Sequence, residues 1–441
     1  MSEFYLPLNR VPLTDEAQTL SLALAREAGW DGAAKTSKAG GRPKDNTGRA
    51  KALTAIVADI LVGTAKSRTR RFWRERSARA FTGLPVSYRA FDDAWKWLQA
   101  EGWIREVYGA TFQATNMFDG TPLKDADRKA ARWEATEGPF AFVEAQGFKP
   151  EDAAKHFAER LPKDVIELRQ TSKIIESYRI KGRRLKFPET PKTKALADTI
   201  HEINRFLAEQ DLGGLTFLGF KRIFFKLPNA KGFSWNHGGR LYSFGDRHFQ
   251  GLSKEDRLKV KINGEPVVEL DVKASHLTIY CGLTGEKASL GRDPYKITGL
   301  PRELVKAWVV KAFGTGGLPN KYPQYAYADY KAAHPGKELG RGHPIRRVEA
   351  AILKSYPTLK KLPSTKWNSL ALEFYESEAV IGTMLELLKA GIPSLPVHDS
   401  LVVPKNAKSK AKAILERQYK TLCGIKPRLE EVSASTRKRK A

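Results

Sequence analysis

The sequence predicts an α+β protein with an antiparallel sheet, preceded by a small basic domain, and three observations predict it. Short apolar runs lie beside two aspartates: Val267–Leu270 precedes Asp271, while Leu395–Val397 and Leu401–Val403 flank His398-Asp399-Ser400. The long segments between them carry apolar residues at helical spacing. The segment from Arg49 to about Thr115 reads helix, helix, two-stranded ribbon. At roughly 150 residues per domain, a chain of 441 residues should contain two or three domains.

Charge is the strongest compositional feature. The chain has 76 lysines and arginines against 49 acids, a formal net charge of +27. Such a protein needs a polyanionic partner, and nucleic acid is the commonest. With 41% apolar and 10% aromatic residues, the chain can build real cores, which excludes global disorder.

Cysteine usage and hydropathy limit the cellular context. Cys281 and Cys423 are the only cysteines, so no disulfide framework, disulfide-linked partner or cysteine-based zinc site is expected. The sequence has no run of 18 apolar residues and no apolar segment near its beginning, so we expect no membrane span and no secretory signal. These features favour a cytoplasmic protein.

The amino-terminal third divides into an arm and a basic domain. Residues 1–47 are expected to be a flexible, poorly packed basic arm, because their end is rich in Gly, Lys and Arg. Residues 48–120 resemble a winged helix in the order of their elements, with a helix at 87–100, a strand at 103–107 and a return strand at 111–115. Five arginines are expected to bind DNA phosphates there: Arg68, Arg70, Arg71, Arg74 and Arg76. The alternative is a small helical domain with a solvated basic face.

The rest of the chain divides into three parts. Residues 121–190 are expected to be a helical bridge or thumb-like region, and they contain a second basic run, KGRRLK, from Lys181. Residues 191–430 look like one continuous α/β unit. Residues 431–441 are expected to be a short basic tail.

Two aspartates lie at the ends of apolar runs. In PVVELDVKASHLTIYCGLTG, Asp271 ends the first run and a helix should follow, so the residue could equally be a helix N-cap. In GIPSLPVHDSLVVP, His398 and Asp399 form the tip of a predicted hairpin, where Asp is common for conformational reasons alone. If the two strands are neighbours, the carboxylates meet. Two Mg²⁺ ions about 3.5–4 Å apart need such an arrangement of oxygen ligands.

At this point the sequence resembles a known family. The two segments are similar to motifs A and C of the palm shared by family-A DNA polymerases and phage-type single-subunit RNA polymerases. Upstream, GGRLYSFGDRHFQGLS is similar to the family's segment that contacts the primer–template duplex. Between the motifs, PRELVKAWVVKAFGTGG resembles motif B, the fingers helix, with Arg302 and Lys306 on one helical face. The layout is most similar to short polymerase-like proteins carried by prophages and plasmids.

The resemblance implies a right-hand polymerase palm with helical fingers, and a role for each matching residue. Asp271, Asp399 and the Val272 carbonyl would hold two Mg²⁺ ions, with Mn²⁺ as an alternative. The incoming nucleotide would contact Arg302, Lys306, Lys311, His276 and Phe313. The primer–template would contact Arg240, Tyr242, Gln250 and His398, although His398 could instead simply cap its hairpin.

The chain departs from the family pattern at three places. Motif B normally ends in Tyr-Gly, whereas here Phe313-Gly314 lies one residue closer to Lys306. Five residues after Asp271, DNA polymerases have Glu and RNA polymerases Gly, but this chain has His276. Motif C reads His-Asp-Ser, as in the RNA polymerases. These residues therefore give a divided indication of whether the substrate is a deoxynucleotide or a ribonucleotide, with a slight preference for deoxynucleotides.

The predicted function is a DNA-directed DNA polymerase that extends a primer in the replication of a phage, plasmid or other mobile element. Its partners would be nucleoside triphosphates and primer–template DNA, with RNA as an alternative template. The first 200 residues show no clustered carboxylates of the kind a proofreading exonuclease needs. Three alternatives stay open: an RNA polymerase or primase with the same palm, a non-catalytic replication initiator that only binds DNA, and a two-metal nuclease.

Overall fold

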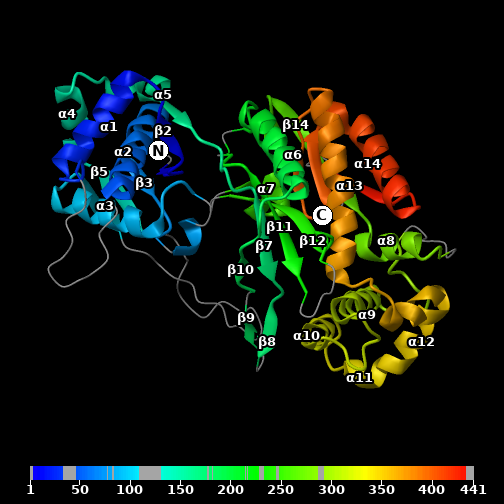
Figure 1. The fold of residues 1–441 in the computed structure, drawn as a ribbon. Coiled ribbons are helices and arrows are strands. Elements are labelled where there is room, and N and C mark those ends of the chain that lie inside the picture. Colours follow the sequence, from blue (N-terminus) through cyan, green and yellow to red (C-terminus); the bar gives the residue numbers. More distant parts are fainter. Residues whose placement is uncertain are drawn as a thin grey trace. The chain divides into compact units, whose positions relative to one another are not determined.

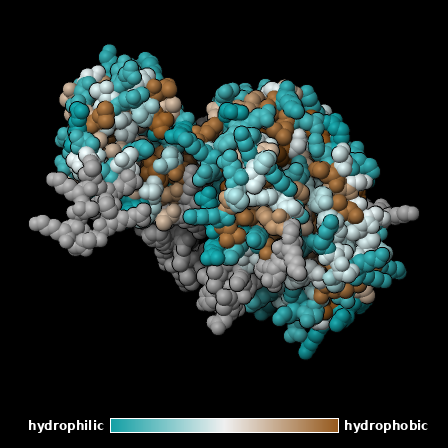
Figure 2. Space-filling view, in the orientation of Figure 1, coloured by the Kyte–Doolittle hydropathy of each residue, from teal (hydrophilic) through white to brown (hydrophobic). Residues whose placement is uncertain are grey.

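The computed structural model describes residues 3–32, 46–76, 78–81, 84–108, 131–175, 178–180, 182–213, 215, 217–227, 233–244, 248–286 and 293–433. The chain forms two compact units (Figure 1). The first consists of Met1–Lys163, Thr216–Gly219 and Phe244–Gly251, and the second of Asp164–Leu215, Phe220–Ser243 and Leu252–Ala441. On the face drawn in Figure 2, hydrophilic residues predominate on each unit, as the high charge leads one to expect.

The first unit packs helices against a four-stranded sheet of order β1-β3-β5-β4. Its strands are β1 (Phe4–Tyr5), β3 (Arg71–Trp73), β4 (Ile104–Tyr108) and β5 (Arg132–Ala135). A separate pair joins β2 (Arg10–Pro12) to β6 (Phe157–Glu159). The helices are α1 (Asp15–Glu27), α2 (Asn46–Ser67), η1 (Ala78–Phe81), α3 (Tyr88–Ala100), α4 (Gly138–Ala145), η2 (Pro150–Asp152) and α5 (Ala153–His156), and the short η3 (Phe249–Gly251) also belongs to this unit.

The core of the first unit is centred on α2, whose residues from Ala52 to Val62 are all buried. Helix α3 begins where the sequence predicts, because Ser87 caps it by accepting a hydrogen bond from the Ala90 amide. Trp95 of α3 packs edge-on against Phe72 and Trp133 of the sheet, with ring centroids 6.0 and 5.0 Å apart. The aromatic side chains of this region are therefore core residues.

The prediction of a poorly packed arm is wrong for residues 3–32. Strand β1 pairs in parallel with β3, and α1 lays Leu20 and Leu24 against the core, where both are at most 1% exposed. Leu6 and Leu8 are fully buried. The apolar residues of this segment have the spacing of one helix face and one strand. The polar residues around them made this pattern difficult to recognise in the sequence. Residues 33–45 of the predicted arm lie outside the described residues.

The predicted ribbon differs in its partner strand. Strand β4 forms as expected, but the strand that pairs with it is β5, at 132–135. The predicted return strand at 111–115 lies outside the described residues. A parallel strand, β1, also joins the sheet from the amino-terminal segment. The winged-helix arrangement therefore stays a prediction.

The second unit contains two main sheets. One has the order β10-β7-β11-β12 and the other β13-β14-β16-β15, with β17 also paired to β14. The strands of the first sheet are β7 (Ile166–Gln170), β10 (Arg184–Leu185), β11 (Phe220–Lys226) and β12 (Gly238–Ser243). Those of the second are β13 (Lys261–Ile262), β14 (Glu265–Val272), β15 (Leu395–Val397), β16 (Ser400–Pro404) and β17 (Leu429–Val432). A small hairpin joins β8 (Lys173–Ile175) to β9 (Tyr178–Ile180).

The helices of the second unit are α6 (Pro191–Ala208), α7 (Lys254–Arg257), α8 (Ser275–Leu283), α9 (Arg302–Thr315), α10 (Gln324–Ala333), α11 (Leu339–Gly342), α12 (Ile345–Ser355), η4 (Pro357–Ser364), α13 (Ser369–Lys389), η5 (Lys405–Ala407) and α14 (Lys408–Cys423). Helices α6, α13 and α14 lie beside the sheets, whereas α9 to α12 gather in a group of helices below them (Figure 1). Among the described residues, none of the helices is both long and apolar enough to cross a membrane.

Two boundaries of the predicted organisation need correction. The helical bridge expected at 121–190 is wrong for residues 166–185, which form strands β7 to β10 of the second unit. Residues 131–163 belong to the first unit instead. The tail expected from residue 431 begins inside β17, and residues 434–441 lie outside the described residues.

Two tight hairpins set the register of the second sheet. Between β13 and β14, Asn263 and Gly264 both have positive φ, 52° and 80°, which is the backbone of a type I′ turn. Between β15 and β16, the turn consists of His398, with φ 56°, and Asp399. The predicted hairpin of motif C therefore forms, and its turn places Asp399 directly before β16.

A buried aspartate should make the stability of the first unit depend on pH. Asp59 of α2 accepts a hydrogen bond from the Leu8 amide at 2.6 Å and lies 3.1 Å from Arg10 Nε. Burial outweighs Arg10 and raises the pKa of Asp59 to about 7. The native state therefore keeps a proton that the unfolded chain releases near pH 4, so charging this group costs native stability.

We expect wild type to lose stability relative to Asp59→Asn as the pH rises from about 4 to about 7, by on the order of 4 kcal/mol, since one pKa unit is about 1.4 kcal/mol. The measurement is calorimetric unfolding of both full-length proteins across this range. A difference between the two proteins that does not vary with pH would contradict the assignment.

Candidate active site

The two aspartates predicted as metal ligands lie at the same end of one strand pair. Strands β14 and β16 are antiparallel neighbours, and Asp271 is opposite Ser400, the residue that follows Asp399. The expectation that the two motifs occupy adjacent strands is therefore confirmed. We expected Asp271 to end its strand, but Val272 continues β14 and pairs with Leu429 of β17.

Burial and the charges of neighbouring acids raise the pKa of both carboxyls. The pKa of Asp271 rises to about 6, first through burial and next through the charge of Asp399. The pKa of Asp399 also rises to about 6, through burial and then through Glu376. Lys254 Nζ, 4.0 Å from Asp271 Oδ2, offsets part of this cost. Two carboxyls whose negative charges are this costly to bury favour binding a shared cation.

The donor chemistry of this pair fits Mg²⁺. Both side chains offer hard carboxylate oxygens, which Mg²⁺ prefers, and Mg²⁺ commonly takes only one or two protein carboxylates. No group of three or more His, Cys, Asp or Glu side chains suited to a metal occurs in the described part of the chain. The ligand set would therefore consist of Asp271, Asp399 and a backbone carbonyl, for which Val272 stays the prediction.

Arg240 is held by two acids of α13. Its Nε donates to Glu376 Oε1 at 2.6 Å, and its Nη1 lies 3.8 Å from Glu373 Oε2. Burial raises the pKa of Glu373 to about 7 despite the nearby guanidinium. The side chain of Arg240 is 20% exposed. We expected its guanidinium to contact the primer–template, but most of that group is paired with these two acids. Its charge also lowers the pKa of Asp399, which makes Arg240 part of the electrostatics of the aspartate pair.

A third acid, Glu269, lies beneath the aspartates and was missed in the sequence. It is 3% exposed and accepts a hydrogen bond from Ser400 Oγ at 2.9 Å. Arg257 Nη2 lies 3.4 Å from both of its carboxylate oxygens. The signal was an acid inside an apolar run, two residues before Asp271 and so on the same strand face. The hydrogen bond to Glu269 therefore gives Ser400 a structural role inside the sheet.

His276 and Phe313 differ in exposure, because the side chain of His276 is 25% exposed whereas Phe313 is buried. Burial lowers the pKa of His276 to about 3, so the ring is neutral, and its Nε2 lies 3.7 Å from Glu376 Oε2. Phe313 is 1% exposed and packs against Tyr280 at 5.4 Å. The prediction that Phe313 contacts the nucleotide is wrong for this conformation, because its ring belongs to the core beneath α9.

The cations of α9 divide into two groups. Arg302 and Lys306 are both exposed, one helical turn apart, as the spacing predicts. Lys311 instead donates to the Lys321 carbonyl at 2.7 Å, so its ammonium group holds the loop after α9 rather than standing free for a triphosphate. Arg302 pairs with Asp293 at 2.5 Å.

Tyr295 connects this helix to the aspartates and was also missed. The guanidinium of Arg302 lies 5.5 Å from the Tyr295 ring centre. Burial raises the pKa of the phenol strongly, and the charge of Asp399 is the next cause. The tyrosine therefore lies within electrostatic reach of both Arg302 and Asp399. No sequence motif marked it, because a tyrosine in an irregular segment has no distinctive pattern.

The remaining predicted duplex contacts differ in their setting. His398 is exposed at the tip of its turn. Tyr242 lies half-buried on β12, where burial and Glu373 raise its pKa to about 12. Gln250 lies in η3 of the first unit, whereas the aspartates belong to the second, so its contact with the primer–template stays a prediction.

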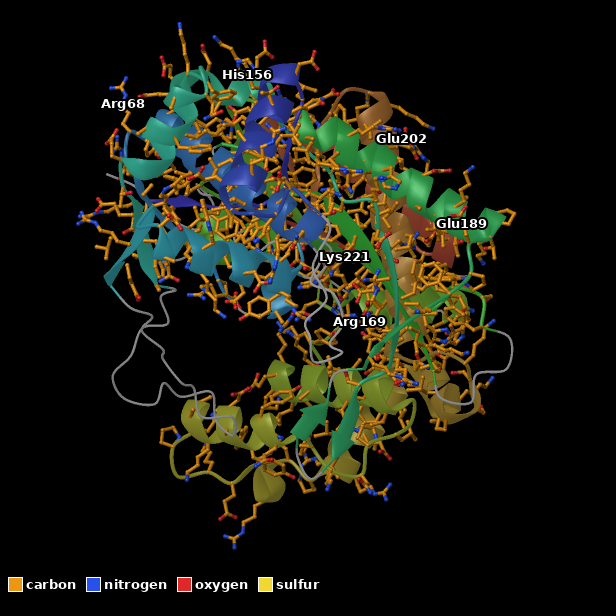
Figure 3. The ribbon with its side chains drawn as sticks, turned by 60° about the vertical axis from the view of Figure 1, so that its left-hand side comes forward. Arg68, His156, Arg169, Glu189, Glu202 and Lys221 are labelled. Atoms are coloured by element: carbon orange, nitrogen blue, oxygen red, sulfur yellow. The ribbon has the colours of Figure 1, made fainter. Side chains whose placement is uncertain are left out.

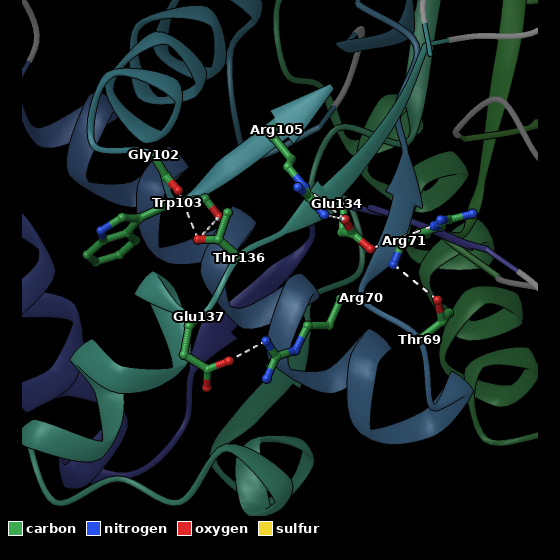
Figure 4. Close-up of polar contacts among 9 residues, drawn as sticks. All are labelled: Thr69, Arg70, Arg71, Gly102, Trp103, Arg105, Glu134, Thr136 and Glu137. Carbon is green, nitrogen blue, oxygen red and sulfur yellow. Dashed lines mark hydrogen bonds and ion pairs between the residues drawn. The ribbon is translucent and has the colours of Figure 1, made fainter. Parts of the chain in front are cut away.

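The basic cluster predicted in the first unit is mostly compensated by acids (Figure 4). Arg70 pairs with Glu137 at 2.5 Å, while Arg71 lies 3.7 Å from Glu134. Arg76 pairs with Asp92 at 3.0 Å. Arg68 is exposed.

Arg74 must be removed from this set. It is 1% exposed, donates to Tyr5 Oη and to the Leu6 carbonyl, and lies over the Phe81 ring. This arginine fastens the amino-terminal strand to the core and cannot reach a phosphate in this conformation. A run of arginines in the sequence gives no indication of which member is buried.

Comparison with known proteins gives a distant structural likeness and no family. No protein-family model matches the chain, and no curated protein matches it. Among solved structures, it is similar to the POL domain of Pol1 from M. smegmatis in complex with DNA primer-template and dNTP, at 10% identity and a TM-score of 0.24 over 54% of this chain. The chain spans half the length (50%) of that domain. A likeness this low carries no argument, so we infer function from the site alone.

Removing Glu269 should destabilise the second unit strongly. Glu269→Ala would leave the Arg257 side chain, 11% exposed, without its carboxylate, and we expect a loss of about 3–5 kcal/mol in the free energy of unfolding. The matched control is Glu265→Ala, an exposed acid on the same strand, for which we expect a change within about 0.5 kcal/mol. Denaturant unfolding of both variants is the measurement. Equal effects would show that Glu269 does not anchor the aspartate strands.

Proposed function

We propose that the protein is a template-directed nucleotidyltransferase, and specifically a DNA-directed DNA polymerase that extends a primer. One observation carries the proposal: Asp271 of β14 lies opposite Ser400 of β16, directly after Asp399, which is 128 positions away in a chain with net charge +27. Paired acids in a strongly basic protein suit chemistry on a polyanion, because the acids need cations and the surface attracts phosphates. A role in the replication of a phage, plasmid or other mobile element belongs to this proposal.

The residues of the site would divide the work of phosphoryl transfer among them. Asp271, Asp399 and the Val272 carbonyl would hold Mg²⁺, with Mn²⁺ as an alternative, and the metal would supply charge stabilisation for phosphoryl oxygens. Glu269 keeps the two strands in register through Ser400 and Arg257. Arg240 keeps Glu373 and Glu376 paired beside Asp399. None of these roles requires a protein nucleophile, so catalysis would depend on positioning and charge.

The exposed face of α9 would bind the incoming nucleotide. Arg302 and Lys306 present two positive charges one turn apart, which suits the phosphates of a nucleoside triphosphate. Tyr295 lies beside Arg302 at this end of α9, and the charge of Asp399 acts on its phenol. Base selection would then come from pairing with the template. His276, neutral and half-buried beside Glu376, adds bulk five residues after Asp271, and we propose that it favours deoxynucleotides.

Replacing one aspartate should separate chemistry from binding. Asp399→Asn keeps the shape of the side chain but removes its charge, so we expect primer extension to fall at least roughly a hundredfold, since a bound metal contributes several kcal/mol. Duplex affinity should stay within about twofold, because the substitution leaves the basic residues in place. The assay is incorporation on a defined primer–template, with dNTPs and rNTPs tested separately and with and without Mg²⁺.

The control is Asp198→Asn, an exposed acid on α6. An Asp399→Asn variant as active as this control would overturn the metal role. Efficient use of rNTPs, or synthesis without a primer, would favour the RNA polymerase or primase alternative. Tight binding to one DNA site without incorporation would favour an initiator, and degradation of labelled DNA without added nucleotides a nuclease.

A further inference from the structure

One face of the β10-β7-β11-β12 sheet gathers positive charge. The register pairs Arg184 with Arg169, Ile223 with Glu167, and Tyr242 with Lys221. Paired residues point to the same side, and side chains two apart share a face. The apolar Ile223 and Phe225 share this face. The basic sheet face is defined by its four cations and two further polar residues: Arg184, Arg169, Lys221, Arg240, Glu167 and Tyr242.

The opposite face of this sheet is the packed one. Ile166, Leu168, Phe220 and Phe224 alternate with the residues above and are all at most 5% exposed. A sheet with one apolar face against the core and one polar face is the usual antiparallel pattern. The side chains of Arg169 and Arg184 keep 28% and 46% exposure. These two arginines can therefore reach a ligand without disturbing the core.

Arg240 is already paired with Glu373 and Glu376, and the other three cations of this face lie near two acids. Glu167, 3% exposed, pairs with Arg169 and with Lys221 at 3.1 Å, and Asp164 lies 3.8 Å from Arg184. The pKa of Lys221 is lowered by burial, and the charges of Arg169 and Arg184 add to that effect, so the three cations lie near one another. Arg169 and Lys221 lie on neighbouring strands (Figure 3). Arg183 and Lys186, both exposed, add further charge beside them.

The basic sheet face leads to the aspartates. Strand β12 carries Tyr242 and Arg240, and the charge of Arg240 acts on Asp399. At about 4.8 Å between strands, the distance from β12 to β10 is roughly 14 Å. That is the length of roughly four nucleotides of one strand, at 3.4 Å each. A nucleic-acid strand beginning at the aspartates could therefore extend across this face.

We propose that the basic sheet face binds the sugar–phosphate backbone of the primer–template duplex, independently of its sequence. The basic run at 181–186, which the catalytic site leaves unused, is part of this surface through Arg184. The proposal rests on the proposed function for the identity of its ligand. It concerns binding alone, so it can fail while the catalytic assignment stands, and the reverse also holds.

The test is the salt dependence of duplex binding. Full-length Arg169→Gln/Arg184→Gln is titrated with a labelled primer–template duplex in EDTA, without nucleotides, at several KCl concentrations. Each phosphate contact contributes about 0.9 to the slope of log K against log salt, so we expect the slope to shrink by about 2. The conservative double variant Arg169→Lys/Arg184→Lys should restore it, because the charges return.

The matched control is Arg417→Gln/Lys426→Gln, two exposed cations of the same unit that also each pair with one acid. Its slope should equal that of wild type. An unchanged slope in the arginine-to-glutamine variant, or an equal loss in the control, would overturn the proposal. If the double variant fails to fold, Arg184→Gln alone, at a residue 46% exposed, should reduce the slope by about 1.

Because metal and nucleotides are absent, this measurement does not depend on catalysis. If the variant reduces the slope but the wild-type protein never incorporates nucleotides, the result supports duplex binding by the basic sheet face and contradicts the polymerase proposal alone. A wild-type slope in an active polymerase would place the duplex elsewhere on the protein.

Discussion

The antiparallel pairing of β14 with β16 is the constraint on which the rest of the site depends. It alone brings Asp271 and Asp399 together, because no other described element links motif A with motif C so closely. A shift of one residue in this register would move Asp271 to the opposite face of the sheet. The two-residue turn at His398-Asp399 and the bond from Ser400 to Glu269 both act against such a shift.

Around this pair, the protein balances several buried acids with a few buried cations. Arg240 serves Glu373 and Glu376, Arg257 serves Glu269, and Arg222 serves Glu378. Each cation comes from a strand or a short helix, and three of the four acid partners lie on α13. Among the acids that the structure describes, only Asp271 and Asp399 have a raised pKa without an arginine in direct contact, and a bound divalent cation would relieve this electrostatic cost.

The sequence predicted the local elements of the site well and their side-chain surroundings poorly. The strands around Asp271, the hairpin of His398 and the exposed cations of α9 follow from apolar runs and helical spacing, which are local properties. The burial of Phe313 and Arg74 depends on residues far away in the chain, as do the contacts of Glu269 and Tyr295, so no local pattern could show them. The packing of residues 3–32 was missed for the same reason: β1 becomes a strand only by pairing with β3.

The most direct test of the central claim is cleavage by iron. Fe²⁺ can replace Mg²⁺ at carboxylate sites, and hydroxyl radicals generated there cut the backbone nearest the ion. If Asp271 and Asp399 share a cation, two groups of fragments should appear together, one ending near residue 271 and one near 399, and excess Mg²⁺ should suppress both. Cleavage near only one aspartate, or at neither, would contradict a shared metal site and with it the nucleotidyltransferase proposal.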